Sequence, residues 1–150
     1  MPSNIDGIYT KNVKSPIGVS VTAANVSSQG GGTIATDIFL IATSDVNNGS
    51  FARRIRCEPT ASAASTTTTA TVARFFISSQ SSGATTSANT VCIGEITLPS
   101  VVAAHPTIPV FPIDFPINDG IGANLSLLVT NHAAPAASTA WRFTLFYGDY

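Results

Sequence analysis

The apolar residues of this chain recur at every second position in one segment after another, and no stretch shows the 3.6-residue period of an amphipathic helix. Segments rich in β-branched and aromatic residues alternate with clusters of Gly, Pro, Asn and Ser, which is typical of short strands joined by turns. The predicted strands span residues 17–22, 33–43, 51–58, 71–78, 90–98, 113–117, 125–130 and 141–147. This pattern predicts an all-β chain, a jelly-roll-like antiparallel β-sandwich with about eight strands and essentially no helix.

The length of 150 residues favours one domain with a sandwich-sized core. We expect residues 1–16 to form an extended amino-terminal arm and residues 17–150 to form a single β-sandwich domain. The segment Pro2–Ile17 is a candidate docking arm. The first residues lack the basic start and apolar central region of a signal peptide, so the chain is expected to be made in a cytosol.

Turn-forming residues predict where several strands end. Asn48-Gly49 readily adopts positive φ and predicts a hairpin loop. Pro59 cannot donate a hydrogen bond to a neighbouring strand, so the strand before it is expected to stop there. The sequence at 118–120, Asn-Asp-Gly, predicts a turn, and the prolines of 101–112 predict an extended edge segment or a wandering loop.

Only 10% of the residues are charged, 7 Lys and Arg against 8 Asp and Glu, whereas soluble domains carry about 25%. The net charge of −1, without a Lys/Arg cluster, argues against nucleic-acid binding, which needs a basic surface. Prolines interrupt the most apolar stretch, and no run reaches the roughly 18 apolar residues of a membrane-spanning helix. We therefore expect no nucleic-acid or membrane partner, and a surface that is coated by hydroxyls or covered by neighbouring protein.

Three arginines, Arg53, Arg54 and Arg56, come closest to a basic patch and are expected to lie on a solvated or interface face. Strict alternation would divide their strand into two faces, one with Phe51, Arg53, Ile55 and Cys57 and the other with Arg54, Arg56 and Glu58.

No pattern of metal-ligating residues is present. The two cysteines, Cys57 and Cys92, are too few for a structural zinc site; we expect free, buried thiols, with a disulfide as the alternative. His105 and His132 lack the His or carboxylate neighbours that a ligand pair requires, so they are interpreted as loop histidines. No metal and no cofactor are therefore predicted.

Glu95 is the one carboxylate set inside an apolar strand, which makes it the strongest candidate for a catalytic acid. A glycosidase needs a second carboxylate close by, and the eight carboxylates are scattered along the chain. We interpret Glu95 as a sheet-edge or subunit-contact charge paired with Arg74 or Arg142. No Gly-x-Ser-x-Gly elbow presents a serine nucleophile, so no catalytic residue is predicted.

Aromatic residues crowd the carboxyl terminus. In strand phase Trp141, Phe143 and Tyr147 share one face, whereas Phe146 points to the other. Large apolar groups on both faces predict a strand packed in the core or buried against another subunit, and both roles remain open.

Three stretches of the carboxyl-terminal half form a recognisable set: 88–99 (ANTVCIGEITLP), 115–120 (FPINDG) followed by 125–130, and the ending from Trp141 to Gly148-Asp149-Tyr150. The resemblance that they carry is to small all-β virion proteins of tailed bacteriophages. It covers residues 71–150, and the first seventy residues match only in texture. The resemblance implies a jelly-roll-like capsid decoration or cement protein, a group that commonly assembles as trimers on the shell and supplies no catalytic residue.

These observations lead us to expect a structural virion protein, not an enzyme, made in the host cytoplasm and bound to the outside of the capsid. Its partners would be the major capsid protein and further copies of itself, with a trimer favoured. Trp141, Phe143 and Tyr147 are the packing candidates, and the three arginines are candidates for contact with an acidic shell.

Two alternatives stay open from the sequence. The chain could be a tail or spike component that binds a host receptor or glycan through the polar loops 60–69 and 79–89. It could also be a small glycan hydrolase that depends on Glu95.

Overall fold

The computed structural model describes residues 12–14 and 18–150, and within them the chain forms eleven strands and no helix. The strands are β1 (Asn12–Lys14), β2 (Val19–Val21), β3 (Gly32–Thr33), β4 (Phe39–Thr43), β5 (Ser50–Ala61), β6 (Thr71–Ser78), β7 (Ala84–Thr85), β8 (Thr90–Leu98), β9 (Ile113–Ile121), β10 (Ser126–Asn131) and β11 (Thr139–Asp149). The all-β prediction is confirmed. The strands beyond the expected eight are β1, β3 and β7, each two or three residues long.

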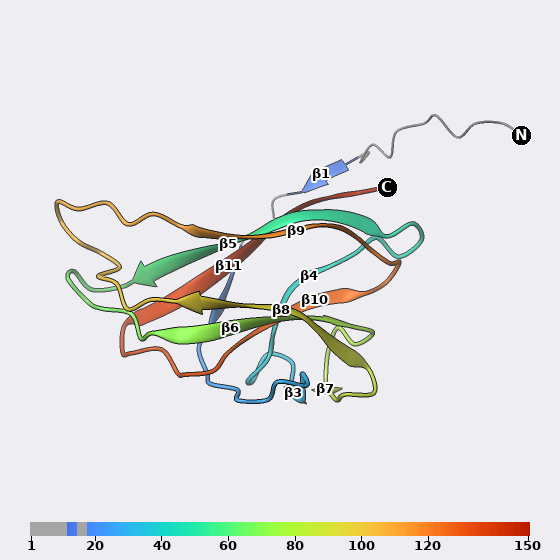
Figure 1. Cartoon of the computed structure of the whole chain (residues 1–150), viewed down its shortest axis with the longest axis horizontal. Helices are drawn as coiled ribbons and strands as arrows, with labels where there is room; N and C mark the ends of the chain where they lie inside the picture. Colours follow the sequence, from blue (N-terminus) through green and yellow to red (C-terminus); the bar gives the residue numbers. More distant parts are fainter. Residues whose placement is uncertain (1–11, 15–17) are drawn as a thin grey trace, which may run out of the picture.

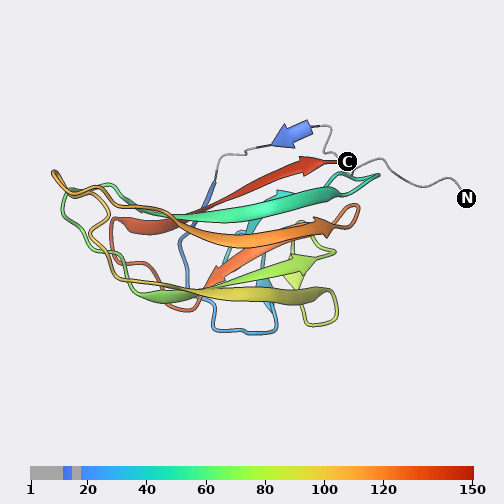
Figure 2. The same cartoon turned by 45° about the horizontal axis from the view of Figure 1, so that its top comes forward.

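Two antiparallel sheets form a sandwich (Figures 1 and 2). The first sheet has the order β11-β5-β9, with β2 and β1 both paired to the free edge of β11, and the second has the order β4-β10-β6-β8. If the short strands β1, β3 and β7 are left out, the eight remaining strands can be renumbered 1 to 8 along the chain. In this numbering the first sheet has the order 1-8-3-6 and the second has the order 2-7-4-5. This is the strand order of a jelly roll.

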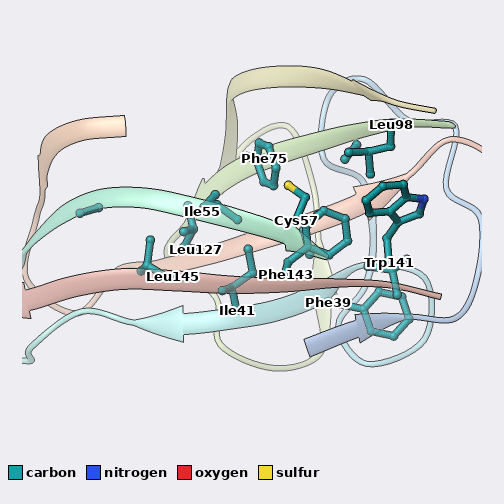
Figure 3. Close-up of a cluster of buried hydrophobic side chains, with 14 of the residues drawn as sticks. Phe39, Ile41, Ile55, Cys57, Phe75, Leu98, Leu127, Trp141, Phe143 and Leu145 are labelled. Atoms are coloured by element: carbon teal, nitrogen blue, oxygen red, sulfur yellow. The ribbon is translucent and has the colours of Figure 1, made fainter. Parts of the chain in front are cut away.

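The hydrophobic core lies between the two sheets (Figure 3). Phe143 of β11 has no exposed surface and meets Phe75 of β6 edge to face, with ring centroids 5.9 Å apart. Phe115 of β9 also packs on Phe75, with 4.7 Å between the ring centroids. Trp141, 2% exposed, extends the same row of side chains toward one end of the sandwich. Two of the three aromatic packing candidates are therefore core residues.

Strand β5 continues through Pro59 to Ala61, so the prediction that Pro59 ends the strand is wrong. The last residue of β5 that pairs with β9 is Cys57, and beyond it β5 has β11 as its only neighbour in the sheet. A proline is tolerated in a strand where one side has no neighbouring strand, because no hydrogen bond from its backbone nitrogen is needed on that side.

A β-bulge at Arg53 overturns the predicted faces of β5. Ala52 and Arg54 pair with consecutive residues of β11, and Arg53 between them pairs with neither neighbour. An extra residue shifts the alternation by one position. Arg53 is therefore exposed while Ile55 and Cys57 are buried, so these residues do not share a face.

Two predicted turns have other roles in the structure. Asn118 has a φ of 51° inside the continuous strand β9, opposite the bulge at Arg53, so 118–120 do not form a turn that ends a strand. Asn48-Gly49 does turn, with a φ of 79° at Gly49. It joins β4 of the second sheet to β5 of the first, however, so it does not close a hairpin.

The predicted strand 33–43 is shorter than expected, because 34–38 form a turn. The Asp37 carboxylate accepts a hydrogen bond from the Thr33 amide at 2.6 Å, and Ala35 has a φ of 71°. A side chain that satisfies the backbone locally competes with strand pairing. The turn places Ile38 against the outer surface of the second sheet, where it forms a second buried cluster with Phe76 and Leu128.

The predicted arm, residues 1–16, lies mostly outside the described residues, as does most of the candidate docking segment Pro2–Ile17. Its described part is β1, which pairs with the end of β11. Lys14 forms an ion pair with the buried carboxylate of Asp149, and the Ser50 hydroxyl donates to the same carboxylate at 2.7 Å. Lys14 also lies 5.7 Å from the centre of the Tyr147 ring.

Acidification is expected to loosen β1 from β11. Burial raises the pKa of Asp149, but the hydrogen bonds from Lys14 and Ser50 and the charge of Lys14 outweigh burial and hold that pKa below its ordinary value. The stabilisation is therefore complete above about pH 4 and is lost as the pH falls through the pKa of the folded protein. The amide resonance of Val13 should move toward its unpaired position in that window, and Asp149→Asn should abolish the transition. A Val13 resonance that is equally pH-dependent in Asp149→Asn would contradict this prediction.

Candidate interaction surfaces

The loop between β8 and β9, residues 99–112, forms an apolar pocket at one end of the sandwich. The pocket has a volume of about 490 Å³ and is lined by Pro99, Val101, Val102, His105, Ile108, Pro109, Val110, Phe111, Ile113 and Trp141. Figures 1 and 2 show this loop extending from the end of the sandwich opposite to the carboxyl terminus. Ile108 is 60% exposed and Phe111 is 78% exposed, so the rim of the pocket is apolar as well.

The first half of this loop is held by hydrogen bonds to the segment that follows β5. The hydroxyl of the buried Thr68 accepts from the Val101 amide at 3.1 Å and lies 3.3 Å from the Pro99 carbonyl oxygen. The backbone of Thr66 accepts from the Ala103 amide at 3.0 Å. The pocket wall therefore has a defined conformation.

His105 fixes the second half of the loop. Its Nδ1 accepts hydrogen bonds from the backbone amides of Thr107 at 3.2 Å and Ile108 at 3.0 Å. This capped turn holds the backbone at Ile108, on the rim of the pocket. The interpretation of His105 as a loop histidine is confirmed. The two hydrogen bonds that its Nδ1 accepts explain why a histidine occupies this position.

Trp141 connects the pocket with the core. Its ring lines the pocket, and its Nε1 is buried with no hydrogen-bond partner among the described residues. Figure 3 shows the Nε1 edge turned away from Cys57 and Phe143. Leaving such a donor unpaired costs about 1–3 kcal/mol. Because Trp141 is the chain's only tryptophan, its fluorescence reports on the pocket directly.

The outer face of the first sheet carries paired arginines. The Nε atoms of Arg54 and Arg56 lie 3.4 Å and 3.2 Å from the two carboxylate oxygens of Asp114 on β9. Both guanidinium groups also lie over the Phe146 ring of β11, at 4.8 Å and 5.2 Å. One carboxylate shared by two guanidinium groups leaves this face with positive charge.

The structure brings Arg54 and Arg56 together and sets Arg53 slightly apart. Arg53 is exposed at the bulge and lines a surface hollow of about 400 Å³ with Arg54 and Asn118. Arg142, also exposed, occupies the same outer face of β11, opposite Glu58 of β5. Sequence reasoning found the three clustered arginines but did not place Asp114, Phe146 and Arg142 on the same face, because only strand pairing brings these residues alongside.

Glu95 pairs with Arg74 across β8 and β6, with 2.6 Å between Oε1 and Nε. The second nitrogen of the Arg74 guanidinium lies 3.1 Å from Nδ1 of His132. Glu95 is exposed, and its carboxylate is engaged by the arginine. The predicted partner Arg74 is therefore confirmed, and Arg142, the other partner considered, lies on the first sheet.

Both cysteines are free, as expected, but the expectation that both are buried is correct only for Cys57. Cys57 is buried in the core from the first sheet, whereas Cys92 is half-buried in the second. Burial, with a smaller contribution from the charge of Asp114, raises the pKa of Cys57 to about 12. Cys57 therefore stays a protonated thiol and packs as a small apolar residue. Tyr147, the third packing candidate, is half-buried against the core edge beside Lys14.

The two polar loops considered for glycan binding lie at opposite ends of β6. The loop predicted at 60–69 begins later, because Thr60 and Ala61 belong to β5, and the segment 62–70 precedes β6. The segment 79–89 follows β6 (Figure 1). They therefore do not combine into one binding surface. The first contacts the pocket loop, and part of the second pairs as β7 with β3.

Among residues 12–14 and 18–150, no three His, Cys, Asp or Glu side chains come close enough to hold a metal ion. In the same residues, no helix is long and apolar enough to cross a membrane. Comparison of the chain with protein-family models, with curated proteins and with solved structures found no match.

Proposed function

We propose that the chain is a structural virion protein of a tailed phage, a capsid decoration or cement protein that binds the outside of the shell. The observation that carries this proposal is the exposed apolar end of the sandwich, formed by the pocket and by Ile108 and Phe111 on its rim. A contiguous apolar surface on a protein this poor in charge is typical of a site that other protein covers. Its activity in this proposal is binding, without a chemical step.

The jelly-roll fold is compatible with this role and does not by itself determine it. Jelly rolls occur in viral capsid proteins, but also in lectins and cupins. The resemblance of residues 71–150 to small phage virion proteins supports the first of these uses. The major capsid protein is the proposed partner.

The arginine face supports a second contact, with an acidic part of the shell. Arg54 and Arg56 are preorganised by Asp114 and by stacking on Phe146, so little side-chain entropy remains to be lost on binding. The guanidinium fork matches carboxylates in geometry as well as charge. In this proposal the arginine face contacts the shell, and the apolar end is covered by a neighbouring protein chain.

Particle composition and localisation test the proposal. Quantitative mass spectrometry of purified particles should find the chain in high copy number, and labelled antibodies should decorate the whole capsid surface. Few copies confined to the tail would contradict the proposal and support the tail or spike alternative. Absence from particles would contradict both.

A charge-reversal variant tests the arginine contact in particles that lack the chain. Arg54→Glu/Arg56→Glu should bind such shells at least about tenfold more weakly, the loss expected of a hot spot. The control is Arg74→Gln, which removes one arginine from the second sheet and should bind as the wild type does. Equal weakening by the two variants would contradict a role for this particular face.

A further inference from the structure

We infer that the apolar end of the sandwich is a self-association surface, in which Phe111 of one copy enters the pocket of a second copy. This inference rests on the proposed function and assigns the residues of its homo-oligomer contact. The partner it names is an identical chain, and the contact needs no ligand.

A protruding apolar group and a complementary hole occur on the same loop. Phe111 is the most exposed large aromatic side chain of the described residues, and it stands on the rim of a pocket of about 490 Å³. Apolar pockets of this size accommodate a ring together with its neighbours. In a pair of copies, Phe111 of each chain can enter the pocket of the other. A different protein would need both a protruding apolar group and a matching pocket of its own.

The charge of the loop also favours an identical partner. No Asp, Glu, Lys or Arg occurs between Glu95 and Asp114. A charged patch repels its own copy, so self-contact through one patch requires that the patch be neutral or self-complementary. The arginine face lacks this property, because two copies would bring four guanidinium groups against one another with only two Asp114 carboxylates.

The loop is preorganised for the contact. Thr68 holds its first half and His105 caps its second half. Prolines at 106, 109 and 112 further restrict the backbone. Association then costs less conformational entropy than it would with an unstructured loop. The exchange of Phe111 closes as a dimer about a two-fold axis or as a ring of three, and either arrangement buries the ring.

Analytical ultracentrifugation of the purified full chain over a wide concentration range tests the inference. The wild type should associate, and the emission of Trp141 should change in parallel because the pocket becomes occupied. Phe111→Glu should weaken association at least about tenfold, as loss of a central anchor does. The matched control is Val91→Glu, since Val91 is 60% exposed on β8, away from the pocket; it should associate like the wild type.

Cross-linking in a Cys92→Ser background locates the contact. One protein carries Ile108→Cys, on the rim that also bears the intact Phe111, and the other carries Val102→Cys, in the pocket wall. Under mild oxidation the mixture should give a disulfide-linked pair of the two variants. Failure of this pair to form would overturn the proposed insertion of residue 111 into the pocket.

Three further results would overturn the inference: a wild type that stays monomeric, a Phe111→Glu variant that associates as the wild type does, or a Val91→Glu variant that is equally impaired. Tight binding of an anilinonaphthalene dye to a monomer, with quenching of Trp141, would assign the pocket to a small apolar ligand instead. A chain that self-associates but is absent from particles would contradict the proposed function and leave this inference standing.

Discussion

Replacement of Phe143 by alanine is expected to lower the free energy of unfolding by about 3–5 kcal/mol. The ring has no exposed surface and packs edge to face on Phe75 of the opposite sheet, so truncation leaves a cavity between the two layers. Because domains of this kind are stable by about 5–15 kcal/mol in total, the variant should be close to unfolding. Urea denaturation followed by the fluorescence of Trp141 measures the loss.

Phe146→Ala is the matched control on the same strand. Its ring points outward and contacts the guanidinium groups of Arg54 and Arg56. Exposed cation–π contacts contribute about 0.5–1 kcal/mol each, so the variant should lose far less stability than Phe143→Ala. Similar losses in the two variants would contradict the assignment of Phe143 to the core and of Phe146 to the outer face.

Substitution of Gly94 by alanine is expected to destabilise the protein by about 1–3 kcal/mol, although the change adds a single methyl group. A Cβ atom at this position would lie 2.4 Å from Cζ of Phe115, which reaches across from the first sheet. Phe115 cannot withdraw freely, because its ring packs 4.7 Å from that of Phe75. A glycine inside a strand often marks such a close approach.

A double-mutant cycle tests this explanation. Phe115→Leu alone should be destabilising, since it shortens a side chain that packs on the core. In the double variant the two costs should be less than additive, because the shorter leucine leaves room for the new methyl group. Additive costs would show that Gly94 is required for another reason. Gly83→Ala is no control, because its positive φ of 73° adds backbone strain.

The strands that sequence reasoning located best are those with clean alternation and turn residues on both sides. Residues 71–78 and 90–98 match β6 and β8 in full. The predicted strand ends were wrong where contacts with residues distant along the chain outweighed the preference of the local sequence. Pro59 stays in a strand because β9 ends its pairing nearby, and the turn at 34–38 is stabilised by Asp37 and by packing on Phe76.

The candidate surfaces were less predictable than the strands. The clustered arginines were visible, but the bulge at Arg53 exposes this residue instead of placing it on the face of Ile55 and Cys57, and a single extra residue leaves no signature in the alternation. The pocket loop was recognised only as an edge segment or a loop. Its long uncharged stretch and regular prolines were the available signal for an apolar surface.

The sequence by itself determined that the protein is all-β, where most strands lie, and that its surface is poor in charge. These properties are local, since period-two alternation and turn residues act over a few neighbours. Only the tertiary structure decided the jelly-roll order, the pairing of Arg54 and Arg56 with Asp114, and the pocket beside Trp141. Each of these joins residues distant along the chain, as the Ser50–Asp149 hydrogen bond does across 99 positions. Such contacts depend on how the two sheets close on each other, which periodicity does not encode.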